Sequence, residues 1–163
     1  MATTDQLKRH RVLVVDDNLL ALEVMVRMLV ALGCTASASP TAAGALGAMA
    51  REAFALLVTD LQMPVMDGWE LARQVRRRFP GLPILAVTGQ DRTQVLAQLG
   101  GSGIDRVLFK PFDLQMLGRE LRSLLPAPDT SPGPDFRWLL GNVPGNPPGG
   151  ADPPLPGRLG RKP

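Results

Sequence analysis

The sequence predicts an α/β fold, a doubly wound parallel sheet of five strands with five helices. Three observations predict it. Short apolar runs alternate with helical stretches throughout residues 1–125, and there are five such runs. The runs are apolar along most of their length, which is typical of parallel strands that are covered on both faces. The length of 163 residues suits one ordinary domain with a remainder.

Each expected strand is a short run that ends at a polar residue or a turn. β-Branched and aliphatic residues dominate four of the runs, while the second alternates weakly. The five expected strands are Arg11–Val15, Cys34–Ser39, Ala55–Thr59, Pro83–Thr88 and Val107–Phe109.

The expected helices lie between these strands and carry start and stop signals. Asn18 caps a helix to Leu32 that Gly33 closes, and Ser39 with Pro40 opens a second helix through Glu52. The three remaining helices are Trp69–Arg78 before Pro80, Arg92–Leu99 before two glycines, and Leu114–Leu125.

Composition changes sharply at Pro126. Residues 126–163 hold 11 of the 16 prolines and 7 of the 17 glycines, so 18 of 38 positions oppose regular structure. Such a segment buries too little apolar surface to offset its ordering entropy. We therefore expect a domain over residues 1–125 and a disordered tail over 126–163, too short and proline-rich for a DNA-binding output domain. The apolar cluster 136–140 within it is expected to be incidental.

Composition also excludes several classes of function. A single cysteine and a single histidine exclude a disulfide framework and the common zinc and iron–sulfur sites. No apolar stretch reaches the roughly 18 residues of a membrane span, and the N-terminus does not resemble a signal peptide. The formal net charge of +3 is too small to indicate nucleic-acid binding, and we expect Arg76–Arg78 to be a solvated helix end. We expect a cytoplasmic protein.

Polar residues follow four of the expected strands. Asp16 and Asp17 end the first strand, Asp60 the third, Thr88 the fourth and Lys110 the fifth. Ligands of open parallel sheets bind at the carboxyl ends of the strands. The sequence therefore predicts that three carboxylates, a hydroxyl and an ammonium group share one edge.

These residue types indicate phosphoryl chemistry. Three adjacent carboxylates repel one another unless a cation intervenes, and oxygen ligands of this kind suit Mg²⁺. A carboxylate can also attack phosphorus to give an aspartyl-phosphate. Lys110 would then neutralise phosphoryl charge, and Thr88 would donate a hydrogen bond to it.

At this point the chain resembles the receiver domains of two-component response regulators, of the single-domain type similar to chemotaxis regulators. Four motifs carry the resemblance across residues 11–125, in order and well spaced: VLVVDDN, LLVTDLQMPVMDGWEL, ILAVTGQ and FKPF. The resemblance implies a flavodoxin-like (βα)5 fold and a phosphoprotein that takes part in phosphorelay signal transduction.

The resemblance also implies a role for individual residues. Asp60 would be the phospho-acceptor and a ligand of Mg²⁺, Asp17 a direct ligand, and Asp16 a ligand through water. The backbone carbonyl of Gln62 would complete the protein ligands.

Further motif residues match the family in turn. Thr88 would be the switch hydroxyl and Lys110 the phosphate-binding lysine. The Lys110–Pro111 bond would be cis, and Gly68 would be the glycine of the turn after the acceptor.

One position departs from the family pattern. The family usually has Tyr or Phe three residues before the lysine, where the ring moves inward behind the threonine and reports phosphorylation. This chain has Val107, which cannot make the same swing. Phe109 shares its strand face, and we expect it to pack in the core; a role as a substitute switch is the alternative.

The resemblance implies a receiver that takes a phosphoryl group from a sensor histidine kinase onto Asp60 and signals to an unknown protein target. It is not an enzyme, apart from catalysing its own phosphorylation and dephosphorylation. A relay or phosphate sink that works with a histidine phosphotransfer protein or hybrid kinase remains an alternative. An aspartyl-phosphate phosphohydrolase fits less well because the first strand lacks an Asp-x-Asp arrangement, and a nucleotide binder would need a glycine-rich loop.

The first helix is the expected kinase-docking element. Glu23 and Arg27 lie four residues apart and mark its solvent face. The same face carries Leu19 and Leu20 beside the active edge, where exposed apolar residues favour a partner over solvent. The alternative is that one or both leucines fold under a neighbouring helix.

Overall fold

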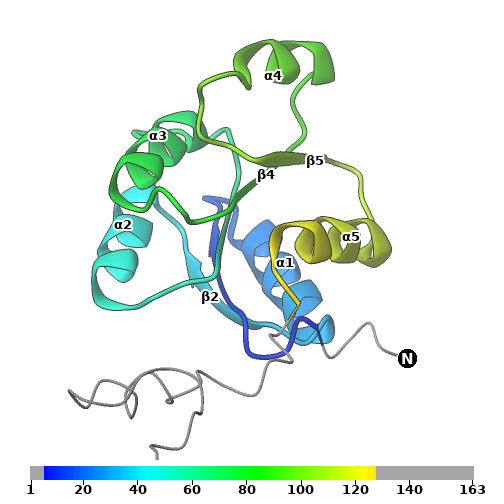
Figure 1. Ribbon diagram of the computed structural model, residues 1–163. Coiled ribbons are helices and arrows are strands. Elements are labelled where there is room, and N and C mark those ends of the chain that lie inside the picture. Colours follow the sequence, from blue (N-terminus) through cyan, green and yellow to red (C-terminus); the bar gives the residue numbers. More distant parts are fainter. Residues whose placement is uncertain (1–5, 128–163) are drawn as a thin grey trace, which may run out of the picture. The chain divides into compact units, whose positions relative to one another are not determined.

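The computed structural model describes residues 6–127, which form the expected five-stranded sheet with five helices (Figure 1). The strands pair in the order β2-β1-β3-β4-β5, and every pair is parallel. In chain order the elements are β1 (Arg11–Val15), α1 (Leu19–Ala31), β2 (Thr35–Ser39), α2 (Ala42–Arg51), β3 (Leu56–Thr59), α3 (Gly68–Arg78), β4 (Ile84–Thr88), α4 (Arg92–Gln98), β5 (Arg106–Phe109) and α5 (Leu114–Leu124).

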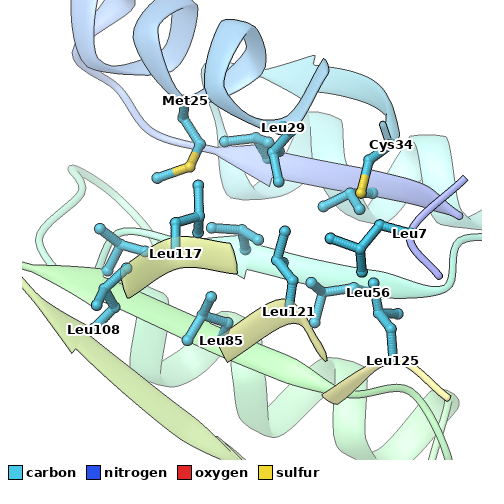
Figure 2. Packing of buried hydrophobic residues seen from close by; sticks show 14 of the residues in the cluster. Leu7, Met25, Leu29, Cys34, Leu56, Leu85, Leu108, Leu117, Leu121 and Leu125 are labelled. Atoms are coloured by element: carbon cyan, nitrogen blue, oxygen red, sulfur yellow. The ribbon is translucent and has the colours of Figure 1, made fainter. Parts of the chain in front are cut away.

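The helices cover both faces of the sheet. Helices α1 and α5 pack on one face, and α2, α3 and α4 contribute side chains to the core on the other. Figure 2 shows the first of these cores, where Leu29 of α1 and Leu117 and Leu121 of α5 meet the sheet. Burying one such leucine fully contributes about 1.5–3 kcal/mol.

The central strands are buried from end to end. All four residues of β3 and all five of β4 are buried, which accounts for their unbroken apolar sequences. The edge strand β2 has the small, polar sequence TASAS and is partly exposed. Cys34, just before it, is buried as a small apolar side chain, and burial raises the pKa of its thiol.

The expected start of the second helix is wrong by two residues. Thr41, not Ser39, is the N-cap, and its side chain accepts a hydrogen bond from the Gly44 N–H at 3.0 Å. Ser39 stays in β2, where it pairs with Val15, because the sheet register holds it there. Its hydroxyl instead donates to the Thr41 carbonyl at 2.8 Å.

The end of α3 is not a uniformly solvated arginine cluster. The Arg76 guanidinium donates to the carbonyls of Gly103 and Pro80 at 2.8 and 2.6 Å. It also pairs with the Asp105 carboxylate at 2.7 Å, and that carboxylate accepts the N–H of Ile84 at the start of β4. Arg76 therefore joins α3 to the segments that lead into β4 and β5.

None of the helices within residues 6–127 has the length and apolar character needed to cross a membrane. The expected tail from residue 128 onward, including the apolar cluster 136–140, lies outside the described residues.

Candidate functional site

The sheet register brings the predicted residues to one edge. Val15 pairs with Thr59, so Asp16 and Asp60 leave neighbouring strands at the same level. Thr88 pairs with Phe109, and the Lys110 N–H donates to the Thr88 carbonyl at 2.8 Å. The strand ends therefore place a carboxylate pair beside a hydroxyl and an ammonium group.

The three aspartates form a compact cluster. One carboxylate oxygen each from Asp16, Asp17 and Asp60 lies within 4.8 Å of the others. Asp16 is buried and Asp17 is exposed, so the cluster opens to solvent on one side.

The electrostatics of the cluster favour a cation. Burial raises the pKa of the Asp16 carboxyl, and the nearby Asp60 charge raises it further. A backbone hydrogen bond from Asn18 and the Lys110 ammonium act in the opposite direction. The Lys110 Nζ lies 3.8 Å from Asp16 Oδ2, too far for a direct hydrogen bond, so much of the negative charge remains unbalanced.

Backbone donors hold one oxygen of Asp60. Its Oδ1 accepts the N–H groups of Leu61 at 2.7 Å and Gln62 at 3.3 Å. Its Oδ2 accepts no hydrogen bond from the part of the chain that the structure describes. The carboxylate is thus fixed in orientation while one oxygen remains available, and the Gln62 backbone is held beside it.

Gly68 packs directly against the acceptor residue. Its N–H donates to the Leu61 carbonyl at 3.1 Å. A Cβ at this position would lie 2.0 Å from the Asp60 carbonyl oxygen, closer than any side chain can approach. The backbone of the loop between β3 and α3 therefore requires glycine here.

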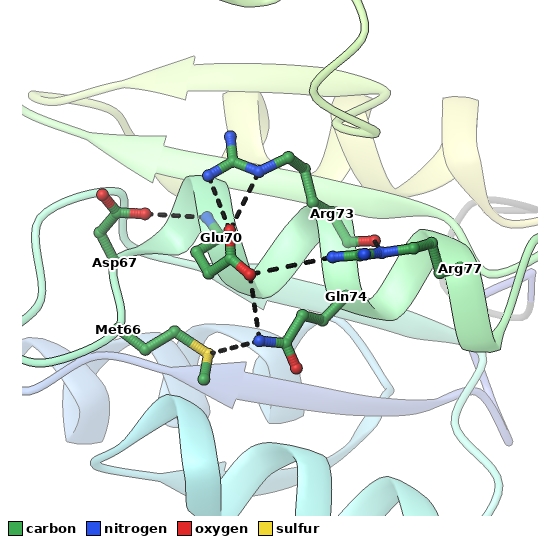
Figure 3. A network of polar contacts seen from close by, with 6 residues as sticks. All are labelled: Met66, Asp67, Glu70, Arg73, Gln74 and Arg77. Carbon is green, nitrogen blue, oxygen red and sulfur yellow. Dashed lines mark hydrogen bonds and ion pairs between the residues drawn. The ribbon is translucent and has the colours of Figure 1, made fainter.

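A polar network on α3 supports the same loop (Figure 3). The Gln74 amide donates to Glu70 Oε1 at 3.1 Å and reaches Met66 Sδ at 3.9 Å. Asp67 caps α3 by accepting the Glu70 N–H at 2.8 Å. Hydrogen bonds from Arg73, then Gln74, lower the pKa of Glu70, so this carboxylate stays ionised as an acceptor for both.

The Thr88 hydroxyl is buried at the end of β4. Its Oγ1 accepts the Gln90 N–H at 3.1 Å, which leaves its proton free to be donated. The Lys110–Pro111 peptide bond that follows β5 is cis, as the family resemblance implied.

These residues together fit a hard divalent cation. The donors are carboxylate oxygens, and such oxygens are the ligands that Mg²⁺ takes alongside water and phosphate. One or two carboxylates with several waters suffice for this ion, so the open side of the cluster is compatible with it.

Helix α1 presents exposed apolar residues beside this edge. Leu19 and Leu20 are 68% and 70% exposed, so the alternative that they fold under a neighbouring helix is wrong. Leu20 and Val24 line a groove of about 440 Å³ together with Pro111 and Phe112. Glu23 and Arg27 lie on the solvent face as expected, and they form an ion pair there.

Sequence reasoning missed two features near the site. Val65 has a positive φ of 70° at the tip of the loop after β3 and is fully exposed, although β-branched residues rarely adopt that conformation. Phe109 is half-buried at the edge of its core rather than enclosed, and the Arg92 guanidinium lies over its ring. No local sequence signal identifies either feature.

Comparison with known proteins identifies the family of this chain. The family model of the response regulator receiver domain matches residues 12–122. The response regulator FleR of Pseudomonas aeruginosa is 35% identical over 107 residues, which are 66% of this chain and 23% of that protein. The response regulator MprA of a Mycobacterium species (strain KMS) is 34% identical over 125 residues, 77% of this chain and 54% of that protein.

A solved structure matches over its whole length. The chemotaxis protein CheY4 of Vibrio cholerae shows a TM-score of 0.68 at 26% identity, covering 72% of this chain and 99% of that chain. By contrast, this chain spans about a quarter of FleR and about half of MprA.

The five-stranded parallel sheet and the carboxylate cluster at its carboxyl edge are consistent with this receiver-domain match. The chain belongs to the receiver domain family of two-component response regulators, a family that uses Mg²⁺.

Proposed function

We propose that this chain accepts a phosphoryl group on Asp60 from the phosphohistidine of a sensor histidine kinase, with Mg²⁺ as cofactor. Asp17 and Asp60 would bind the ion directly, Asp16 through water, and the Gln62 carbonyl would complete the protein ligands. The observation that carries the proposal is the anchored Asp60 carboxylate, with one oxygen held by two backbone N–H groups and two further carboxylates within 4.8 Å.

In the proposed step, the unhindered Asp60 oxygen attacks phosphorus as the phosphorus–nitrogen bond of the donor breaks. The electron pair of that bond leaves with the donor imidazole, and an acyl phosphate forms on Asp60. Mg²⁺, when bound, would neutralise charge on the phosphoryl oxygens. Lys110 would balance the remaining charge, and Thr88 would donate its hydroxyl proton to a phosphoryl oxygen.

The proposed output of this cytoplasmic receiver is a protein–protein contact. The exposed leucines of α1 and the adjoining groove suit the helical surface of a kinase or phosphotransfer protein. Val107 favours a second candidate, a relay or sink that returns phosphate to a histidine phosphotransfer protein, because such a role needs no large aromatic movement. Rapid back-transfer from phosphorylated Asp60 to that protein would distinguish the relay.

Labelling with acetyl phosphate tests the acceptor. We expect Asp60→Asn to abolish Mg²⁺-dependent labelling because an amide is a poor nucleophile. Asp67→Asn is the matched control, since Asp67 is a nearby exposed carboxylate whose capping bond an amide oxygen preserves. Full labelling of Asp60→Asn would refute the assignment.

The metal assignment has its own measurement. Asp17→Ala should weaken Mg²⁺ binding because it removes a direct carboxylate ligand from an otherwise intact site. Titration of the isolated protein with Mg²⁺ measures this, and an unchanged affinity would remove Asp17 from the ligand set.

A further inference from the structure

Strand β2 forms one edge of the sheet, and alternate residues along it direct their backbone groups away from β1. The Thr35 N–H donates to the His10 carbonyl at 2.9 Å, which fixes Thr35 as a residue that bonds toward β1. Backbone groups alternate between the two sides of a strand, so the N–H and carbonyl groups of Ala36 and Ala38 point outward. Within residues 6–127 these outward groups have no hydrogen-bond partner. The outer side of β2 therefore offers two donors and two acceptors.

This edge lacks the features that usually prevent edge strands from pairing. Natural edge strands carry charged residues, proline or a β-bulge. The segment Thr35–Ser39 has none of these, and its register with β1 is unbroken. Residues 28–50 as a whole carry no charged side chain, whereas the opposite edge strand β5 begins with Arg106 and is followed by Lys110. The β2 edge is thus open to another strand, and depletion of charge is typical of the centre of a protein interface.

The sequence of β2 is self-complementary. TASAS reads almost the same in both directions, with Ser37 at its centre. Antiparallel pairing of two copies about Ser37 places Ala36 opposite Ala38 of the second copy. The outward N–H and carbonyl groups of each alanine then meet their complements, so all four groups of each copy are bonded. The same register places Thr35 opposite Ser39 of the second copy, and hydroxyl residues in such cross-strand pairs stabilise one another. One two-fold axis therefore satisfies the whole edge, which favours a second copy of this chain as the occupant.

The helices on either side of this edge suit the same contact. On α1, Val26 and Val30 lie one turn apart, on the flank opposite the groove that Leu20 and Val24 line. Val30 is 57% exposed, so a second copy would cover an apolar side chain there. On the other face, α2 consists mostly of alanine and glycine, and the exposed Ala43 presents only a methyl group. Small side chains allow another backbone to approach closely.

We propose that two copies of this chain form a dimer in which β2 pairs antiparallel with β2 about Ser37, so that their sheets join into one. The proposal goes beyond the proposed function and does not depend on it. Because the paired strands run in opposite directions, the two Asp60 sites lie at opposite edges of the joined sheet. The groove beside Leu20 lies on the other flank of α1, so both Asp60 sites stay accessible to a phosphoryl donor.

Sedimentation velocity of the whole chain over a range of concentrations measures the association. We expect a reversible equilibrium between monomer and dimer. Ala38→Lys, which places a charge on the pairing edge, should weaken dimerisation at least tenfold. Ala38→Pro removes one outward N–H without touching the bonds to β1, a position where an edge strand tolerates proline, and should weaken it as well. Ala97→Lys makes the matched change at an exposed alanine of α4 and should leave the dimer intact. Melting temperatures establish that each variant is folded.

Disulfide cross-linking tests the register. Ser37 lies opposite Ser37 of the second copy in a pair without mutual backbone bonds, where Cα atoms are about 4.5 Å apart, a separation that a disulfide spans. Ser37→Cys, in a chain that also carries Cys34→Ala, should therefore form a covalent dimer under mild oxidation. Thr35→Cys in the same background is the control. Its thiol would be displaced from that of the second copy by four residues along the strand, about 13 Å, and should not cross-link.

Several results would overturn the proposal. A chain that sediments as a monomer at every concentration does not form this dimer. A dimer that Ala38→Lys leaves as stable as Ala97→Lys does uses another surface. Equal cross-linking of Thr35→Cys and Ser37→Cys would exclude the register. If Ala38→Pro does not fold, Ala38→Lys and the two cysteine variants decide the question without it. None of these measurements involves phosphorylation, so failure of the proposed function would leave this result unaffected.

Discussion

Leu20 offers the sharpest test of how the kinase docks. With 70% of its surface exposed, Leu20 contributes little to folding, so Leu20→Glu should change the free energy of unfolding by less than about 0.5 kcal/mol. Fully burying a leucine is worth about 1.5–3 kcal/mol, and 70% of that is about 1–2 kcal/mol against a partner. A glutamate also carries a charge into that interface. We therefore expect transfer from the cognate kinase to slow at least tenfold, which corresponds to about 1.4 kcal/mol.

The assay compares two phosphoryl donors on the same protein. Acetyl phosphate needs no protein surface, so its labelling of Asp60 should be nearly unchanged by Leu20→Glu. The kinase is chosen beforehand by profiling transfer to the unchanged protein from the histidine kinases of the source organism. Leu96→Glu on α4, where the leucine is 50% exposed, is the matched control and should leave both rates intact.

Two results would refute this reasoning. If Leu20→Glu changes neither rate, the kinase does not use this end of α1. If it lowers the melting temperature and impairs both donors together, Leu20 supports the fold rather than an interface.

Three further predictions follow from the same contacts. Arg76→Ala should lower the free energy of unfolding by about 1–3 kcal/mol in urea titrations, because it leaves the Asp105 carboxylate without its cation. The control Arg78→Ala should change the free energy of unfolding by less than about 0.5 kcal/mol. Equal effects of the two substitutions would contradict the role of Arg76. The pKa of Asp16 is raised in the folded state, so the folded protein holds the Asp16 proton more tightly than the unfolded chain does. Protonated Asp16 therefore stabilises the fold at acidic pH, and this stabilisation is lost as pH rises through the raised pKa. Asp16→Asn should therefore melt higher than the unchanged protein at pH 7 with EDTA, and this advantage should vanish below the ordinary pKa of 3.8; a lower melting temperature at pH 7 would count against it. A chain ending at residue 127 should keep full acetyl-phosphate labelling, and loss of labelling or folding would show that residues 128–163 take part.

The sequence alone is enough to predict the alternation of strands and helices, because apolar periodicity and helix caps are local properties. It also determined the candidate site. The carboxyl ends of parallel strands share an edge, so Asp16, Asp60, Thr88 and Lys110 come together once the strands are assigned. The boundaries agree within one or two residues. The largest difference, at the start of α2, arose because Ser39 and Thr41 can both cap a helix and the sheet register holds Ser39 in β2.

Which side chains meet across elements depends on the packed structure and could not be predicted. Arg76 reaches a carboxylate 29 residues away, and nothing in the run Arg76–Arg78 distinguishes it from its neighbours. The contact of Arg92 with Phe109 and the exposure of Leu20 likewise depend on how α4 and α1 are packed against the sheet. Such contacts depend on how whole helices and strands are placed relative to one another. A hydrophobic pattern in the sequence shows only the periodicity within a single helix or strand.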